Sequence, residues 1–202
     1  MTRICIFGDS ITWGAYDPDQ GGWVGRLRKH FESRRVDAEI YNCGINGDNT
    51  FSLLKRFEAE SKAREPDVIM FAIGINDSQY VNSKDNPRVS LQDYNRNLQK
   101  LLALAKKQAK VVIFVGLTCV DEAITAPIPW NPIKYYENER IRQYDAVLES
   151  FCTENGLLYI PMFDLLKKND FYDGLHPNSQ GHQKISERAS VFLMKSVVAA
   201  SQ

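Results

Sequence analysis

The sequence predicts an α/β fold with one parallel sheet of five strands and helices on both faces. Short runs of β-branched and aromatic residues alternate with longer stretches of helical periodicity along the whole chain. The strand runs are continuously apolar, which is typical of parallel strands covered on both faces. Because crossovers between parallel strands are right-handed, each intervening helix is expected to pack back onto the sheet.

The elements follow one another in a regular order. The expected strands span residues 4–7, 39–41, 68–73, 111–115 and 157–160, and the expected helices span 23–31, 51–63, 91–107, 135–154 and 179–198. Pro66 stands before the third strand, Gly156 follows the fourth helix, and Asn178 is a candidate N-cap of the last helix. Two long connections, 78–90 and 117–133, follow the third and fourth strands, at the edge where such sheets bind ligands.

Length, charge and hydropathy indicate the number of domains and the kinds of partner that the sequence is compatible with. The 202 residues contain no linker-like stretch and no repeat, so we expect a single domain over residues 1–202. With 25 basic and 25 acidic residues the formal net charge is zero, and we expect no nucleic-acid partner. No apolar run approaches the roughly 20 residues of a membrane span, so we expect no membrane insertion. In the absence of a signal-peptide pattern, the expected location is cytoplasmic.

Cysteine and histidine usage gives no sign of a metal site. The four cysteines, Cys5, Cys43, Cys119 and Cys152, lie far apart without a Cys-x-x-Cys pair, and we expect buried free thiols in a reducing compartment. The three histidines form no cluster at zinc spacing. We therefore expect neither a metal nor an organic cofactor.

A serine follows the first strand directly, in Gly8-Asp9-Ser10. Its hydroxyl is expected just past the carboxyl end of a strand, where sheets of this kind bind ligands. A serine at such a place more often caps a helix, so this block alone does not decide the function.

Asp173 and His176 stand three positions apart in a loop before the last helix. A serine nucleophile needs a base that accepts its proton and a carboxylate that holds the base in the right tautomer. Neither His30 nor His182 has an acid beside it in a loop. His176 is therefore the candidate base.

Residues that can donate to an oxyanion follow the second and third strands. Gly44 and Gly47 come after the second strand, and Asn76 comes after the third. A glycine backbone N–H and an asparagine amide are donors that acyl transfer requires, although each residue alone is more often explained by a turn or a cap. Their convergence with Ser10 and His176 on one edge of the sheet favours an acyl-transfer site.

These blocks resemble those of the SGNH hydrolases, also called the GDSL esterase/lipase family. Gly8-Asp9-Ser10 is similar to the first block of that family, Gly74-Ile75-Asn76-Asp77 to its Gly-x-Asn-Asp block, and residues 173–176 to its Asp-x-x-His block. The resemblance spans the chain and implies Ser10 as the nucleophile, His176 as the base and Asp173 as the residue that orients it.

The resemblance also implies the oxyanion hole and the strand order. The donors are the backbone N–H groups of Ser10 and Gly47 together with the Asn76 side chain. The family's glycine usually follows a strand-end asparagine by five positions, as Gly47 follows Asn42, which favours Gly47 over Gly44. The implied fold is a three-layer α/β/α arrangement with flavodoxin-like strand order 2-1-3-4-5.

Aromatic and apolar residues beside the blocks are candidates for substrate binding: Trp13, Tyr80, Trp130, Tyr172 and Leu175. Trp130 is equally well explained as a packed loop anchor among prolines. Lys84, Asp85 and Arg88 are expected to form a solvated loop face.

The leading hypothesis is a serine esterase that hydrolyses carboxylic esters, such as short-chain acyl or acetyl esters, through an acyl-enzyme intermediate on Ser10. Its expected partner is a small-molecule ester. One alternative is a non-catalytic flavodoxin-like module that binds a small molecule or phosphate at residues 44–47, although the Gly-rich phosphate motifs are absent. Another is catalysis by Cys5 or Cys43. Acetylated carbohydrates, alkyl or aryl esters, thioesters and lysophospholipids all stay open as substrates, and so does the oligomeric state.

Overall fold

The computed structural model describes residues 1–195, and its centre is a parallel sheet of five strands in the order β2-β1-β3-β6-β8. Counted along the chain, these strands stand in the predicted order 2-1-3-4-5. Their bounds are β1 (Thr2–Gly8), β2 (Ala38–Gly44), β3 (Val68–Ala72), β6 (Val111–Val115) and β8 (Leu158–Ile160). The α/β class and the strand order are thereby confirmed.

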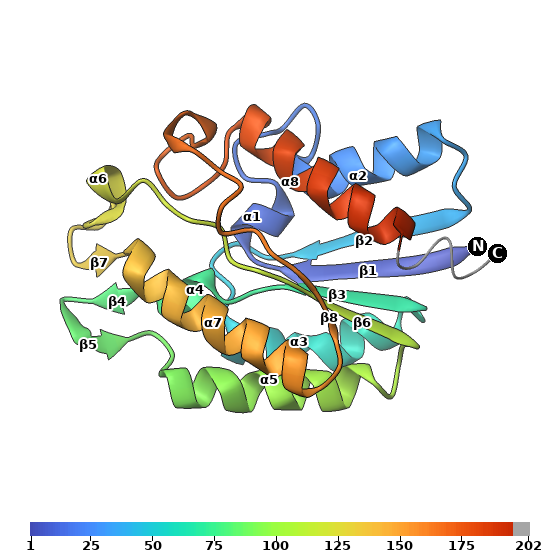
Figure 1. Ribbon diagram of the computed structural model, residues 1–202, viewed down its shortest axis with the longest axis horizontal. Coiled ribbons are helices and arrows are strands. Elements are labelled where there is room, and N and C mark those ends of the chain that lie inside the picture. Colours follow the sequence, from blue (N-terminus) through green and yellow to red (C-terminus); the bar gives the residue numbers. More distant parts are fainter. Residues whose placement is uncertain (196–202) are drawn as a thin grey trace.

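Helices cover both faces of the sheet and complete three layers. In Figure 1, α2 and α8 lie above the sheet, and α3, α5 and α7 lie below it. Their bounds are α2 (Gly22–Ser33), α3 (Thr50–Lys62), α5 (Leu91–Ala105), α7 (Asn138–Glu154) and α8 (Ser179–Leu193). The end expected for the last helix, at residue 198, lies outside the described residues.

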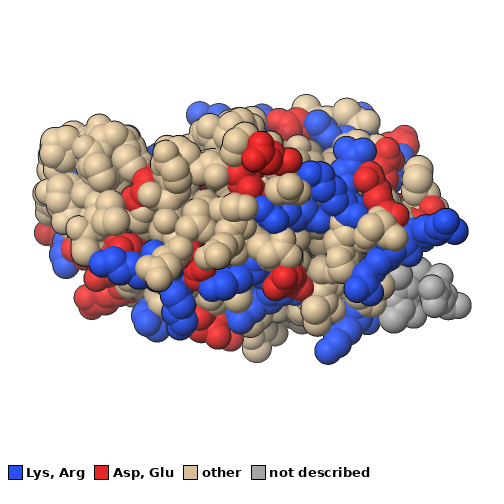
Figure 2. Space-filling view, turned by 90° about the horizontal axis from the view of Figure 1, so that it is seen from above, with Lys and Arg blue, Asp and Glu red and all other residues tan. Residues whose placement is uncertain are grey.

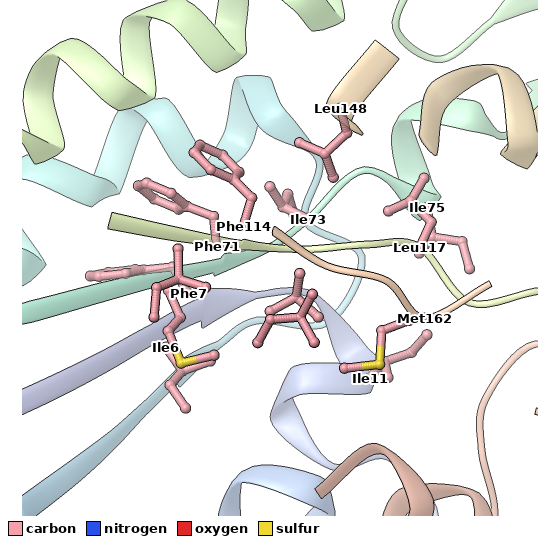
Figure 3. Close-up of a cluster of buried hydrophobic side chains, with 14 of the residues drawn as sticks. Ile6, Phe7, Ile11, Phe71, Ile73, Ile75, Phe114, Leu117, Leu148 and Met162 are labelled. Atoms are coloured by element: carbon pink, nitrogen blue, oxygen red, sulfur yellow. The ribbon is translucent and has the colours of Figure 1, made fainter. Parts of the chain in front are cut away.

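The core between the sheet and helices α3 and α7 is built around one phenylalanine on each of three neighbouring strands (Figure 3). Phe7 and Phe71 have ring centroids 6.1 Å apart, and Phe71 and Phe114 have centroids 5.1 Å apart. Phe57 of α3 and Phe151 of α7 pack against this row, at 4.9 Å from Phe7 and 5.6 Å from Phe114. Burial of each such ring stabilises the fold by roughly 1.5–3 kcal/mol, so the row fixes the helices against the sheet.

Side-chain caps define where three of the helices begin. The side chains of Asn49, Ser90 and Asn178 accept hydrogen bonds from the first turns of α3, α5 and α8. Each bond satisfies a backbone N–H that has no partner within its own helix. The cap expected at Asn178 is thereby confirmed.

Strand β2 extends three residues beyond its predicted end. Asn42, Cys43 and Gly44 pair in register with Ile6, Phe7 and Gly8 of β1. Asparagine and glycine are depleted in strands, which is why the sequence pattern ended the strand at residue 41. Gly44 therefore lies within the sheet and not in a loop after it.

The first long connection and the residues directly after the second form a small second sheet that the sequence did not predict. Its three strands have the order β5-β4-β7, with bounds β4 (Tyr80–Val81), β5 (Ser83–Pro87) and β7 (Lys134–Tyr135). Tyr80 pairs with Tyr135, so residue 135 belongs to this sheet and the predicted helix 135–154 begins only at Asn138. Such short strands have no measurable hydrophobic period, and the helical pattern of the following residues concealed β7.

The charged surface over α2 and α8 is mixed in sign. Figure 2 looks down on this layer and shows Lys and Arg side chains interspersed with Asp and Glu. Arg26 has a structural role there, because it pairs at 2.9 Å with the buried Asp17 and donates at 2.6 Å to Ser179 of α8. Arg26 thus ties the segment after the first strand to the last helix.

The cysteines are free thiols, and their environments differ. Cys5, Cys43 and Cys152 are buried as expected, whereas Cys119 is only half-buried because it lies in the loop that follows β6. Within residues 1–195, no group of three His, Cys, Asp or Glu side chains is arranged to hold a metal ion. In the same range no helix has both the length and the apolar character needed to span a membrane.

Candidate active site

Ser10 is the first residue of the short helix α1 (Ser10–Trp13), which begins directly after β1. Asp9 caps this helix, since its Oδ1 accepts a hydrogen bond from the Ile11 N–H at 2.9 Å. Gly8 is required by close packing: a Cβ there would lie 2.1 Å from Thr12 Oγ1 and 2.5 Å from the Ala72 carbonyl oxygen on β3. The block therefore places the Ser10 hydroxyl at the carboxyl edge of the sheet, as predicted.

His176 and Asp173 lie in the loop between the 3-10 helix η1 (Lys168–Asp170) and α8. Asp173 Oδ1 accepts hydrogen bonds from the backbone N–H groups of Leu175 and His176, at 3.1 Å and 2.8 Å. The carboxylate thus holds its own loop in a tight turn. Asp173 Oδ2 lies 2.8 Å from His176 Nδ1, and His176 Nε2 lies 2.9 Å from Ser10 Oγ.

These contacts assign the histidine tautomer. A carboxylate only accepts hydrogen bonds, so His176 Nδ1 carries the proton that Asp173 accepts. In the neutral ring Nε2 is then left with a free lone pair, directed at the Ser10 hydroxyl. The order serine, histidine, carboxylate is the one that general-base activation of a hydroxyl requires.

Two carboxyl groups beside the site have shifted pKa values in opposite directions. Burial raises the pKa of Asp173, but hydrogen bonds from the His176 ring and backbone lower it by more, so the net pKa lies below its ordinary value. Complete burial raises the pKa of Asp9 to about 7. Asp173 is therefore ionised at neutral pH, whereas Asp9 changes its charge near neutral pH.

Asn76 enters the site from the short helix α4 (Ile75–Ser78), which follows β3. Its amide Nδ2 donates at 2.9 Å to the Asp48 carbonyl oxygen, and the Tyr136 hydroxyl donates at 2.6 Å to its Oδ1. Because the Asp48 carbonyl can only accept, these two bonds fix which end of the amide is nitrogen. One Nδ2 hydrogen is used on Asp48 and the other is free to donate.

The two candidate glycines have different environments. Gly44 lies in β2, where an added Cβ would lie 2.3 Å from the Trp13 backbone nitrogen, so its lack of a side chain serves packing. Gly47 has φ of 78° and no atom within 4 Å of the place where a Cβ would be. It lines the same cavity as Ser10 and Asn76. The geometry favours Gly47 over Gly44 as the donor.

A cavity of about 690 Å³ opens above these residues. Its lining includes Ser10, Gly47, Asn76 and His176. Three of the predicted substrate-binding residues, Trp13, Trp130 and Leu175, also line it. Residues from four strand ends and from both long connections therefore converge on one cavity.

The chain matches the GDSL-like Lipase/Acylhydrolase family over residues 6–184. The protein belongs to this family. It is accordingly a GDSL-type esterase/acylhydrolase, an ester hydrolase of the SGNH group, and the serine to histidine contact is consistent with a catalytic serine.

Relatives of this GDSL-type hydrolase include two plant proteins. The chain is 24% identical to "GDSL esterase/lipase WDL1" of Oryza sativa subsp. japonica, over 90% of this chain and 74% of the relative. It is 26% identical to "GDSL esterase/lipase At5g62930" of Arabidopsis thaliana, over 93% and 84%. Among solved structures, Axe2, an acetylxylan esterase from Geobacillus stearothermophilus, superposes with a TM-score of 0.75 at 20% identity, covering 95% of this chain and 94% of the other. That likeness shows the shared fold.

Two of the predicted substrate-binding residues of the GDSL-type hydrolase do not line the cavity. Tyr80 is buried in the small sheet, where its ring stacks on Tyr135 with centroids 4.9 Å apart and its hydroxyl donates to Glu137 at 2.7 Å. Tyr172 is 65% exposed and stacks at 4.0 Å on Tyr16, which itself lines the cavity. Tyr80 is buried away from the cavity, and Tyr172 contacts Tyr16 without lining the cavity itself. Proximity to a motif in the sequence was therefore not sufficient to predict that these two residues line the cavity.

The remaining histidine and cysteine candidates of the hydrolase are occupied or buried. His182 is fully buried, its Nδ1 accepts from the Trp23 N–H at 3.2 Å, and its Nε2 donates to the Ala15 carbonyl at 2.9 Å. Cys5 and Cys43 lie inside strands, at 0% and 4% exposure. Neither thiol reaches the cavity, which removes cysteine catalysis at these positions.

Two residues of the hydrolase site were not found from the sequence. Tyr136 contacts Asn76, but it lies in a segment predicted as helix. Arg88 is exposed, as expected of a solvated loop face, but it also lines the cavity, and its Nη2 donates at 2.9 Å to the Gly47 carbonyl. The only available signal was their place near the long connections, since neither stands in a motif.

Proposed function

We propose that this protein is a serine esterase that hydrolyses short-chain acyl or acetyl esters through an acyl-enzyme intermediate on Ser10. The observation that carries the proposal is the chain of contacts from Ser10 Oγ to His176 Nε2 at 2.9 Å and from His176 Nδ1 to Asp173 at 2.8 Å. Ser10 and His176 line the same cavity as Gly47 and Asn76.

In the first half of the reaction, Ser10 Oγ attacks the carbonyl carbon of the ester while His176 Nε2 accepts its proton. The ionised Asp173 stabilises the imidazolium that forms and keeps the ring oriented. The carbonyl oxygen becomes an oxyanion, which the backbone N–H groups of Ser10 and Gly47 and the free Asn76 N–H stabilise. His176 then returns the proton to the alcohol as it leaves.

In the second half, water takes the place of the alcohol. His176 accepts a proton from the water as it attacks the acyl carbon, and the same three donors stabilise the second oxyanion. Collapse of this intermediate releases the carboxylic acid and restores the Ser10 hydroxyl. Every proton in the cycle passes through His176 Nε2.

The preference for short acyl groups is supported by one protein of the same fold and by the side chains that surround the nucleophile. The two plant relatives are named esterase/lipase, and a protein of the same fold, Axe2, is an acetylxylan esterase. The walls beside the nucleophile are formed by bulky side chains, among them Trp13, Trp130 and Leu175. Acetyl esters are therefore the first substrates to test.

The test is a series of para-nitrophenyl esters from acetate through butyrate and octanoate to palmitate. We expect the highest kcat/KM for acetate or butyrate and no measurable turnover by Ser10→Ala. Ser150→Ala, on the exposed surface of α7, is the matched control and is expected to keep full activity. Equal activity of Ser10→Ala and wild type would refute the mechanism, and a maximum at palmitate would refute the acyl preference.

A further inference from the structure

The cavity has a marked charge asymmetry. Two basic residues, Arg88 and Lys134, are part of its lining, and no Asp or Glu is found among the described residues that line it. The whole chain has a formal net charge of zero, so this excess of positive charge is local. Arg88 lies just after β5 in the first long connection, and Lys134 lies in β7, directly after the second long connection.

Within residues 1–195, neither Arg88 nor Lys134 has a carboxylate within 4 Å. Other cations nearby are neutralised: Lys84 pairs with Glu137 at 2.7 Å, and Arg56 pairs with Asp48 at 2.7 Å. The charges on Arg88 and Lys134 therefore remain directed at the cavity and its contents.

The fold holds the Arg88 side chain and the Lys134 backbone in place. The Arg88 Nη2 donates at 2.9 Å to the Gly47 carbonyl, which leaves the other donors of the guanidinium for a ligand. Lys134 pairs with Val81 across the small sheet, and its carbonyl accepts from the Ile128 N–H at 2.9 Å. A fixed backbone lowers the conformational cost of presenting a charge to a bound molecule.

The apolar side chains that line the rest of the cavity strengthen the attraction between these two charges and a bound anion. Its walls include the apolar or aromatic side chains of Trp13, Tyr16, Ile128, Trp130 and Leu175. An anion bound among such side chains loses part of its hydration, so it requires a charged partner. Charge-assisted hydrogen bonds in such surroundings are about twice as strong as neutral ones.

We infer that the preferred substrates of this esterase carry a carboxylate group in addition to the ester, and that Arg88 and Lys134 bind it. The inference rests on the proposed function for the ester chemistry and adds the substrate class. The ester carbonyl lies at Ser10 while the carboxylate, on either the acyl or the alcohol part, reaches the two cations.

Lys134 gives a cleaner test than Arg88, because Arg88 also holds the carbonyl of Gly47. Loss of Arg88 disturbs the proposed oxyanion donor as well as the charge. Lys134 has no hydrogen bond from its side chain to the proposed catalytic residues among the contacts of the described chain. Arg88→Lys, which keeps the charge, complements Lys134→Gln, which removes it.

The experiment measures kcat/KM for two matched pairs of esters. In the first pair the acyl part carries the charge: para-nitrophenyl hydrogen glutarate against its methyl ester. In the second pair the alcohol part carries it: para-acetoxybenzoate against methyl para-acetoxybenzoate. We expect the charged member of at least one pair to be preferred by roughly tenfold, the size of one charge-assisted hydrogen bond.

Lys134→Gln should reduce that ratio to about a third, because Arg88 still binds the carboxylate, and Lys134→Glu should reduce it further. Lys100→Gln, an exposed lysine on α5, is the matched control and should leave the ratio as in wild type. Added salt should raise the KM of the charged ester only. A wild-type preference for the neutral ester in both pairs, or a ratio unaffected by Lys134→Gln, would overturn the inference.

A binding measurement separates this inference from the proposed function. Ser10→Ala cannot form an acyl-enzyme, and binding of each ester to it can be followed by the fluorescence of Trp13 and Trp130, which line the cavity. If Ser10→Ala binds the charged esters more tightly than the neutral ones, and if this difference is smaller in the Ser10→Ala, Lys134→Gln double variant, the inference is supported even if wild type hydrolyses neither ester. Equal binding of charged and neutral esters would overturn it, whatever the catalytic result.

Discussion

Tyr136→Phe tests how the oxyanion site is held together. The change removes one hydroxyl, which donates at 2.6 Å to Asn76 Oδ1, and leaves the ring in place. Asn76 and Tyr136 are 4% and 3% exposed, so the amide oxygen loses its partner in a place where water does not readily replace it. Asn76 keeps only its bond to the Asp48 carbonyl.

The expected effect can be bounded from these contacts. A buried acceptor without a partner costs about 1–3 kcal/mol. If the Asn76 amide rotates away from the oxyanion to avoid this cost, the rate falls by about 5- to 150-fold. Removal of the amide itself, in Asn76→Ala, sets the upper limit at roughly 10²–10³ in kcat. We expect Tyr136→Phe to lower kcat by at least about fivefold but by less than Asn76→Ala does, with a smaller effect on KM.

The double variant decides whether Tyr136 acts through Asn76. If it does, adding Tyr136→Phe to Asn76→Ala should change kcat by less than about twofold, because the group that Tyr136 orients is already gone. Tyr159→Phe, which removes a hydroxyl from Asp145 away from the cavity, is the control and should leave kcat unchanged. If Tyr136→Phe lowers kcat as much in the Asn76→Ala background as it does in the wild-type background, the reasoning is refuted.

Four further changes probe the carboxylates and the histidines. Asp173→Asn should lower kcat by roughly 10³–10⁴ at neutral pH with little change in unfolding temperature, since Asp173 is ionised there and fixes the tautomer of His176; a loss below tenfold would count against this role. Asp9 has a pKa raised to about 7, so it binds its proton more tightly in the folded than in the unfolded chain, and its contribution to the free energy of unfolding declines as pH rises from about 4 to 7. Asp9→Asn should therefore gain stability relative to wild type over that interval, by on the order of 4 kcal/mol in chemical denaturation, and a difference independent of pH would contradict it. His176→Gln should abolish activity and leave the unfolding temperature unchanged. His182→Gln should destabilise the fold by about 1–3 kcal/mol and leave kcat of the folded protein unchanged. The reverse pattern would make His182 the catalytic histidine and His176 the structural one.

The positions of the central strands and of the motif residues followed from simple rules. The apolar run Val111–Val115 is short and rich in β-branched residues, which favours a covered parallel strand over a buried helix, and that strand was predicted with its correct ends. Once the sheet is parallel, every strand ends at the same edge. Residues 10, 76 and 176, far apart in sequence, were therefore expected to meet.

What could not be predicted depends on contacts between the loops. Tyr136 acquires its place because β7 pairs with β4, a contact between segments more than 50 residues apart with no periodic signal. Arg88 lines the cavity because it reaches the Gly47 carbonyl, 41 positions away along the chain. Tyr80 was misplaced for the same reason, since its burial depends on stacking against Tyr135. Such pairings arise only when the whole fold brings the two connections together.

The central claim, that Ser10 is a nucleophile activated by His176, is tested most directly by covalent labelling. A fluorophosphonate reacts only with an activated serine, and the labelled residue can be identified by mass spectrometry of peptides. We predict one adduct per chain, on Ser10, absent in Ser10→Ala and at least about a hundredfold slower to form in His176→Gln. Labelling of Ser10 at the wild-type rate in His176→Gln, or labelling of another residue in Ser10→Ala, would contradict the claim.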